Sequence, residues 1–246
     1  MIAKLIKVIY GKKSFEYKFY DNFRYIKNLD TLFSLENIKE IYNSTFIDKK
    51  VNPTLNLDYL YSKCKFDYKD WFTHNIPIWN FYIKKMSKIK YLEIGTFEGR
   101  SVVFVAKTIK ELISIDVVDT FKGSDEHGSM KIDFNKVYRN FKNNTNQFKD
   151  LLTIHKSNSN SFFKKNKKKF NLIYIDGSHH YADVLEDLIN SYKFLEKDGI
   201  IICDDFKWTS YYQNKNENPA LAIIKFIKLY KVKILYIGYQ VILKKH

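Results

Sequence analysis

The stretch Lys90-Tyr-Leu-Glu-Ile-Gly-Thr-Phe-Glu-Gly-Arg-Ser-Val-Val-Phe-Val-Ala106 decides how this 246-residue sequence is interpreted. Its pattern predicts a short buried strand ending at Ile94, a glycine-rich turn, and a helix that begins near Ser101. Gly95 and Gly99 would let the backbone of the turn approach a ligand closely, where a Cβ would obstruct it. The free N–H groups at the start of the helix favour anionic or carboxylate groups. An ordinary strand–helix turn has the same pattern, so the remaining sequence must decide between a binding site and a plain turn.

Apolar runs alternate with helical patterns after this turn, which predicts an α/β fold with a largely parallel sheet covered on both faces. The clearest helix follows Ile175 and is expected to stop at Gly199, and a last helix begins near Pro219. The expected strands are Tyr91–Ile94, Leu112–Val118, Leu152–His155, Leu172–Ile175 and Ile200–Cys203, followed by a strand pair at Val232–Ile237 and Tyr239–Leu243.

Residues 1–68 carry no pattern of obvious chemistry and are predicted to form an N-terminal extension, on the acceptor side of a site or in oligomerisation. The main domain is expected at 69–246. Apolar residues alternate at 6, 8 and 10 and again at 15, 17 and 19 around Gly11, which predicts a hairpin. Short helices are expected at 35–44 and 54–63. Asn75 and Pro77 predict the start of a helix that runs into Met86, and residues 208–218 form the expected mobile loop.

Composition limits the classes of function. A hydrophobic content of 45% supports a real core, and the net charge of +15 comes with many Asn, Ile, Tyr and Phe residues, so it indicates a bias of the whole chain. A nucleic-acid partner is therefore disfavoured. Cys64 and Cys203 form neither a disulfide framework nor a zinc pattern, which favours a reducing compartment. No apolar run approaches the roughly 20 residues of a membrane span. We expect a cytoplasmic protein without a membrane partner, and a homo-oligomer stays open.

Acidic and polar side chains follow the expected strands at the edge where ligands bind in open α/β sheets. Unpaired buried carboxylates are costly, so this many acids need donors, a cation or water. A function explains them better than packing does. The residues are Glu93, then Asp116 or Asp119, then Ser157 and Asn158, then Asp176, then Asp204 and Asp205.

Two segments resemble known enzymes. Glu93-Ile-Gly-Thr-Phe-Glu-Gly-Arg-Ser101 is similar to the first motif of class I S-adenosylmethionine-dependent methyltransferases. Tyr174-Ile-Asp-Gly-Ser-His-His-Tyr-Ala-Asp-Val-Leu-Glu-Asp187 with Leu195-Glu-Lys-Asp-Gly-Ile-Ile-Ile-Cys-Asp-Asp205 resembles one branch of them. That branch holds metal-dependent sugar O-methyltransferases (macrocin O-methyltransferase) and relatives grouped with a cephalosporin hydroxylase. The resemblance covers residues 70–245 and implies a Rossmann-like, doubly wound sheet of seven strands with an antiparallel C-terminal strand.

The resemblance also implies how S-adenosylmethionine would be held. The turn would hold the amino-acid part, with Glu93 accepting from its ammonium group through water or Ser101. An acid near the end of the second strand would hold the ribose hydroxyls. Asp116 has the simpler strand-end position, but Asp119 matches the relatives better and is preferred. The full set of expected cofactor-binding residues is Glu93, Gly95, Thr96, Gly99, Ser101, Asp116 or Asp119, Ser157, Asn158 and Asp176.

A divalent cation is implied as well. In the related enzymes the ligands are an Asp after the fourth strand and an acidic pair after the fifth, which correspond here to Asp176, Asp204 and Asp205. Oxygen ligands suit Mg²⁺ or Mn²⁺. His179 would be the general base, as its counterpart is in the relatives. Secondary candidates are His74, Glu126 and His127, with Gly123 as the pivot of a closing loop at 120–127.

The sequence therefore predicts an S-adenosylmethionine-dependent O-methyltransferase that acts on a hydroxyl of a small molecule, a sugar or glycan, with metal assistance and a His base. Three alternatives stay open: a hydroxylase-associated relative on the same scaffold, a non-catalytic S-adenosylmethionine-binding module, and a nucleic-acid methyltransferase suggested by basicity alone.

Overall fold

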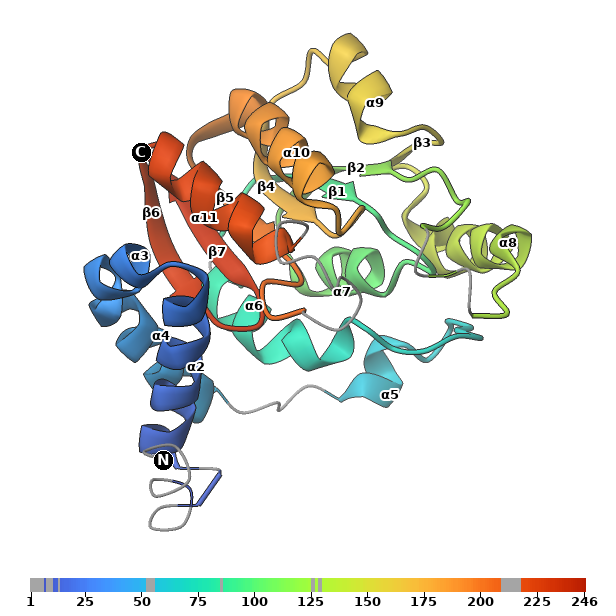
Figure 1. The fold of residues 1–246 in the computed structure, drawn as a ribbon. Helices are drawn as coiled ribbons and strands as arrows, with labels where there is room; N and C mark the ends of the chain where they lie inside the picture. Colours follow the sequence, from blue (N-terminus) through green and yellow to red (C-terminus); the bar gives the residue numbers. More distant parts are fainter. Residues whose placement is uncertain are drawn as a thin grey trace.

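A seven-stranded sheet forms the centre of the protein (Figure 1). The computed structural model describes residues 7, 11–12, 14–51, 56–84, 86–124, 127, 130–208 and 218–246. The strands are β1 (Ile89–Ile94), β2 (Leu112–Val118), β3 (Leu152–His155), β4 (Phe170–Ile175), β5 (Leu195–Cys203), β6 (Val232–Ile237) and β7 (Val241–Lys245). Their order is β3-β2-β1-β4-β5-β7-β6, with β1 to β5 parallel and β7 antiparallel to both of its neighbours. The predicted fold class is confirmed.

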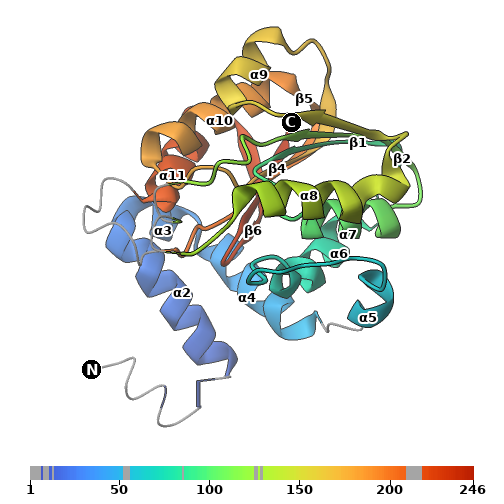
Figure 2. The ribbon, with the colours of Figure 1, turned by 90° about the vertical axis from the view of Figure 1, so that its right-hand side faces the viewer.

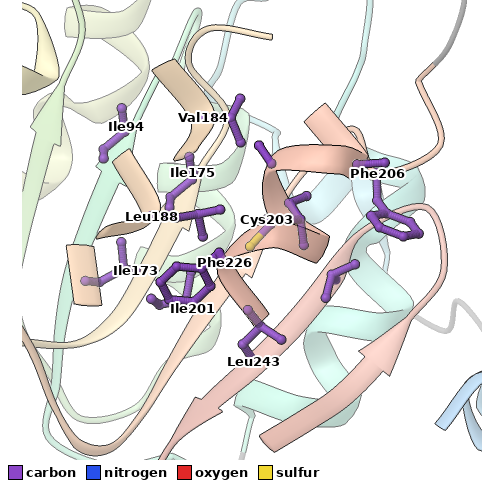
Figure 3. Close-up of a cluster of buried hydrophobic side chains, with 14 of the residues drawn as sticks. Ile94, Ile173, Ile175, Val184, Leu188, Ile201, Cys203, Phe206, Phe226 and Leu243 are labelled. Carbon is purple, nitrogen blue, oxygen red and sulfur yellow. The ribbon is translucent and has the colours of Figure 1, made fainter. Parts of the chain in front are cut away.

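Helices cover both faces of the sheet, as a doubly wound fold requires (Figures 1 and 2). One face carries α6 (Ile76–Ile83), α7 (Arg100–Thr108) and α8 (Phe134–Thr145), and the other carries α9 (Ser159–Lys165), α10 (Tyr181–Phe194) and α11 (Pro219–Leu229). Side chains alternate along a strand. Ile173 and Ile175 of β4 therefore enter one core with Leu188 and Phe226 (Figure 3), whereas Tyr174 enters the core on the opposite face.

The N-terminal extension is helical, so the predicted hairpin is wrong for residues 15–19. These residues begin α2 (Phe15–Leu29), which Ser14 caps by accepting from the Tyr17 N–H at 3.1 Å. The aromatic residues continue at a spacing of four, and the rings of Phe15, Phe19 and Phe23 stack in sequence along the helix. The period is therefore that of a helix. The other arm of the hairpin, Ile6, Val8 and Tyr10, lies outside the described residues.

The extension continues with α3 (Thr31–Glu36), α4 (Ile38–Lys50) and the short α5 (Leu57–Leu60), where one helix was expected at 35–44 and another at 54–63. Hydrogen bonds attach α2 and α4 to the end of β6. Asn22 donates to the Ile237 carbonyl at 2.9 Å, Ser44 accepts from the Ile237 N–H at 2.9 Å, and Tyr236 donates to Asp48 at 2.6 Å. The extension thus covers one end of the sheet edge.

Three boundaries differ from the predictions. The helix expected from Pro77 to Met86 ends at Ile83, and Asn75 precedes it without a side-chain capping bond. The Asn75 amide instead approaches Asp204 at 3.5 Å. Gly199 lies inside β5, because α10 ends at Phe194 and the strand begins at once. Most of the expected mobile loop, residues 209–217, lies outside the described residues. Within the described parts, no helix has the length and apolar character needed to cross a bilayer.

Candidate active site

A cavity of about 1,020 Å³ opens where the parallel strands end. The chain runs outward from β1 to β2 and β3 on one side and from β4 to β5 on the other, so the β1–β4 junction is the topological switch point at which such sheets bind ligands. The predicted site residues that line it are Gly95, Thr96, Asp119, Ser157, Asn158, Asp176, His179, Asp204 and Asp205. Glu93, Gly99, Ser101 and Asp116 do not line it.

Backbone conformation and packing within the protein explain the two glycines of the turn. Gly95 has φ +79°, and a Cβ there would lie 1.9 Å from the carbonyl oxygen of Asp176 at the end of β4. Gly99 has φ +81°, and a Cβ there would lie 2.9 Å from the Phe141 ring. The sequence interpretation, close approach to a ligand, is therefore not needed to explain either glycine. Phe97 between them also has a positive φ of +52°, a conformation that is unusual for a bulky residue.

Glu93 and Ser101 lie behind the turn. The Glu93 carboxyl group is fully buried and bonds the Tyr91 hydroxyl and the Ser101 hydroxyl, each at 2.5 Å. Burial raises the pKa of Glu93 to about 8, against the opposing effect of these hydrogen bonds. Both oxygens therefore already have partners within the protein, and this carboxyl group supports the turn from the core.

Asp119 and Asp116 occupy different environments. Asp119 lines the cavity and fastens the glycine turn to the end of β2, because it accepts from the N–H groups of Thr96 at 2.8 Å and Phe97 at 3.2 Å. Asp116 was expected at a strand end, but it lies two residues inside β2 and is fully buried. It pairs with Lys168 at 2.7 Å and with His155 at 2.8 Å, away from the cavity.

Asp176, His179 and Asp205 come together on the other wall. One possible ligand atom of each lies within 4.8 Å of the others, and His179 Nε2 is 2.7 Å from Asp205 Oδ2. Burial raises the pKa of Asp176 to about 6; the bond to His179 opposes this shift and repulsion by Asp205 adds to it. Asp205 has a positive φ of +56°, which marks backbone strain at this point.

Asp204 lies beside this cluster but outside it. Its Oδ2 accepts from Gln240 Nε2 at 2.8 Å and contacts the Tyr174 hydroxyl, and its Oδ1 accepts from the Asp205 N–H at 2.8 Å. The amide of Gln240 is oriented by Trp79, whose indole N–H donates to Gln240 Oε1 at 2.8 Å. Asp204 lines the same cavity but is not among the three residues whose ligand atoms come together. This differs from the expected set of Asp176, Asp204 and Asp205.

The Tyr174 hydroxyl joins the two acids of neighbouring strands. It lies 2.9 Å from Asp176 Oδ2 and also contacts Asp204. A phenol carries one proton, so one of the two contacts needs a proton from a carboxyl group. Burial and the nearby Asp176 raise the pKa of Asp204 well above its usual value. A raised pKa favours the neutral form of Asp204, which allows the Tyr174 hydroxyl to lie between the two acids.

Aromatic side chains complete the wall, and sequence reasoning missed most of them. Trp71 lies with its ring centroid 5.0 Å from that of Phe97, and Trp208 lies 4.5 Å from His179. Tyr239, between β6 and β7, donates to Asp205 Oδ1 at 3.0 Å. These residues come from separate loops, so no local pattern in the sequence marks them. The secondary candidates His74 and His127 and the pivot Gly123 line the cavity, whereas Glu126 lies outside the described residues.

Part of the chain is similar to known proteins. Residues 92–206, just under half of the chain, match a family described as a methyltransferase domain. An uncharacterized protein of Acanthamoeba polyphaga mimivirus is 31% identical over 133 residues, which are 48% of this chain and 52% of that protein. The chain thus spans about half the length of this curated relative.

Solved structures show the same fold at low identity. An O-methyltransferase of Bacillus cereus in complex with SAH is 12% identical, with a TM-score of 0.53 over 82% of this chain and 96% of that one. A putative rRNA-methylase of Clostridium thermocellum is 14% identical, with a TM-score of 0.52 over 74% and 100%. The middle of this chain is therefore similar to a methyltransferase domain, and its fold is that of the Bacillus cereus O-methyltransferase structure.

Proposed function

We propose that this protein transfers the methyl group of S-adenosylmethionine to a hydroxyl oxygen of a small molecule, a sugar or glycan. The observation that carries the proposal is the Asp176–His179–Asp205 cluster, because it shares one cavity with the glycine turn and Asp119. The cofactor would lie along the ends of β1, β2 and β3, on Gly95, Thr96, Asp119, Ser157 and Asn158. The acceptor would lie at the ends of β4 and β5.

His179 is proposed as the general base. As the acceptor oxygen forms a bond to the methyl carbon, the bond between that carbon and the sulfur breaks, S-adenosylhomocysteine leaves, and His179 takes the hydroxyl proton. The Asp205 carboxylate, 2.7 Å away, orients the imidazole and stabilises its charged form. Trp208 packs on the same ring and restricts it. General-base catalysis contributes roughly 10²–10⁴-fold, so orientation of the acceptor must supply much of the remaining acceleration.

Asp176 and Asp205 are proposed to hold a divalent cation, Mg²⁺ or Mn²⁺. The fit is chemical, because two neighbouring carboxylates offer hard oxygen ligands and repel each other without a cation. Mg²⁺ is commonly held by one or two carboxylates together with water and substrate oxygens. When bound, the ion supplies Lewis-acid chemistry that lowers the pKa of a coordinated hydroxyl. Asp204 is left out of the proposed set, because its oxygens bond Gln240, Tyr174 and the Asp205 N–H.

The test begins with calorimetric binding of S-adenosylhomocysteine to the full chain, with and without Mg²⁺. Turnover is then followed by mass spectrometry across a panel of sugar acceptors. His179→Gln is expected to keep cofactor binding and lose turnover, whereas the matched control His180→Gln, which does not line the cavity, should keep both.

Absence of cofactor binding would overturn the proposal as a whole. Unchanged activity of His179→Gln would favour a non-catalytic binding module. Turnover that persists in excess chelator would remove the cation alone and leave the His179–Asp205 pair as the catalytic unit.

A further inference from the structure

A second cavity, of about 460 Å³, lies between the N-terminal extension and the turn that joins β6 to β7. Helices α2 and α4 form one side of it, with Lys18 and Asp21 from α2 and Asp48 from α4. Lys207, just after β5, contributes from the main domain. The volume falls in the range of ligand pockets, roughly 300–1,000 Å³. The candidate active site assigns no role to these charged groups, so their arrangement around an open space needs an explanation of its own.

The second cavity adjoins the candidate active site. His74 and Tyr239 line both cavities, and their ring centroids lie 5.3 Å apart. The Tyr239 hydroxyl also donates to Asp205 at 3.0 Å. A group bound in the second cavity would therefore be one side chain away from the proposed reacting centre.

The charged side chains of this cavity have hydrogen-bonding capacity to spare. Lys18, Lys207, Asp21 and Asp48 line it, yet within the described parts of the chain no ion pair of 4.0 Å or less joins any of them. Asp48 accepts one hydrogen bond within the protein, from the Tyr236 hydroxyl to its Oδ1 at 2.6 Å. In the same wall, Asn22 uses its Nδ2 on the Ile237 carbonyl, and its Oδ1 has no hydrogen-bond partner among the described residues.

The two ammonium and two carboxylate groups restrict the class of ligand. An anion such as phosphate would meet two carboxylates, and a cation would meet two lysines. A hydroxyl group both donates and accepts, so a ring bearing several hydroxyls can bond both kinds of group at once. The rings of Tyr17, His74 and Tyr239 also line the cavity and offer apolar faces to the C–H bonds of such a ring.

We propose that this second cavity binds an uncharged, polyhydroxylated unit of the acceptor, adjacent to the unit that is methylated. The proposal rests on the proposed function for the role of the neighbouring site. It gives the N-terminal extension a defined task, which is recognition of acceptors with two or more sugar units. Because α2 and α4 supply no residue to the larger cavity, changes in these helices should affect acceptor binding and leave cofactor binding unchanged.

The experiment uses the labelled full chain, saturated with S-adenosylhomocysteine, on an array of neutral mono-, di- and oligosaccharides. We expect retention on glycans of two or more units. Asp48→Asn and Lys207→Met should each weaken this retention about tenfold or more, because each removes a charged hydrogen-bonding group. Lys18→Met and Lys27→Met form a matched pair on α2. Lys18 lines the cavity and Lys27 is exposed away from it, so only the first should weaken retention.

Calorimetry of S-adenosylhomocysteine on every variant separates the outcomes. Unchanged cofactor affinity shows that a variant is folded and that its loss of glycan binding is local. The inference is overturned if single sugars bind as well as longer glycans, if the cavity variants bind like the wild type, or if anionic glycans are preferred. It is also overturned if the wild-type chain binds cofactor and no neutral glycan, and the methyltransferase assignment would then stand. Failure of cofactor binding itself would count against the proposed function.

Discussion

Replacing Gly95 with alanine is expected to destabilise the protein far more than the same change at Gly99. Both glycines have φ close to +80°, so both variants carry the left-handed strain of an L-residue, about 1–2 kcal/mol. At Gly99 the nearest atoms belong to the Phe141 side chain at 2.9 Å, and that ring can shift. At Gly95 the nearest atoms are backbone, with the Asp176 carbonyl oxygen at 1.9 Å.

The magnitude follows from the movement that the new Cβ requires. Ordinary contact begins at 3.4 Å, so the end of β4 must move by about 1.5 Å from that of β1. This movement breaks the hydrogen bond from the Asp176 N–H to the Ile94 carbonyl, now 2.8 Å long. Strain, overpacking and a lost hydrogen bond together give about 3–6 kcal/mol for Gly95→Ala, against about 1–3 kcal/mol for Gly99→Ala.

Urea denaturation followed by circular dichroism measures both free energies of unfolding. Because Asp176 is displaced in Gly95→Ala, cation binding should weaken in whatever fraction stays folded. Equal stability of the two variants would refute the argument that β4 packing, and not ligand approach, requires the glycine at position 95.

Further outcomes are expected from the buried acids. Burial raises the pKa of Glu93 to about 8 from an unfolded value near 4.5, so the folded state keeps a proton that the unfolded state loses, and stability should fall as pH rises between these values. Glu93 contributes about 1.4 kcal/mol per pH unit to this slope. The difference between urea midpoints at pH 6 and pH 8 should therefore be smaller in Glu93→Gln than in the wild type. Asp204→Asn should change Mn²⁺ affinity, measured by calorimetry, less than about threefold, because the Asp204 oxygens already have partners within the protein. Asp205→Asn should weaken it about tenfold or more; the reverse order would restore Asp204 as a ligand. Lys168→Met leaves buried Asp116 with His155 alone and should cost about 1–3 kcal/mol of stability without changing cofactor affinity. Asp119→Asn should lower cofactor affinity. Weaker cofactor binding by Lys168→Met would contradict the assignment of Asp116 to structure and of Asp119 to the cofactor.

The strands could be predicted well because their signal is local. The bounds of β2 and β3 were predicted as the structure has them. The apolar run Leu172–Ile175 marks β4, since parallel strands covered on both faces are largely apolar. The N-terminal region failed because Phe15, Tyr17 and Phe19 alternate over a short window, and only the continuation to Phe23 and Ile26 reveals the helical period.

The candidate site could be predicted in its residue types but not in its exact members. Asp204 and Asp205 are adjacent in the sequence, and nothing local distinguishes them. In the structure, Trp79 bonds Gln240 and Gln240 bonds Asp204, although both lie far from Asp204 in the sequence. Asp205 instead has a positive φ and joins the cluster with Asp176 and His179. The aromatic residues of the cavity wall could not be predicted from local sequence either, because each comes from a different loop.

The short connection between β6 and β7 has a consequence for how acceptors could diversify. Tyr239 and Gln240 lie there, and each bonds one of the two adjacent acids. The match to the methyltransferase family ends at residue 206, before this hairpin, and begins at residue 92, after the N-terminal helices. The second cavity is built entirely from those two flanking parts and Lys207. Under the proposed function, exchange of the segments before and after the matched core would change the acceptor and leave the cofactor site at the strand ends as it is.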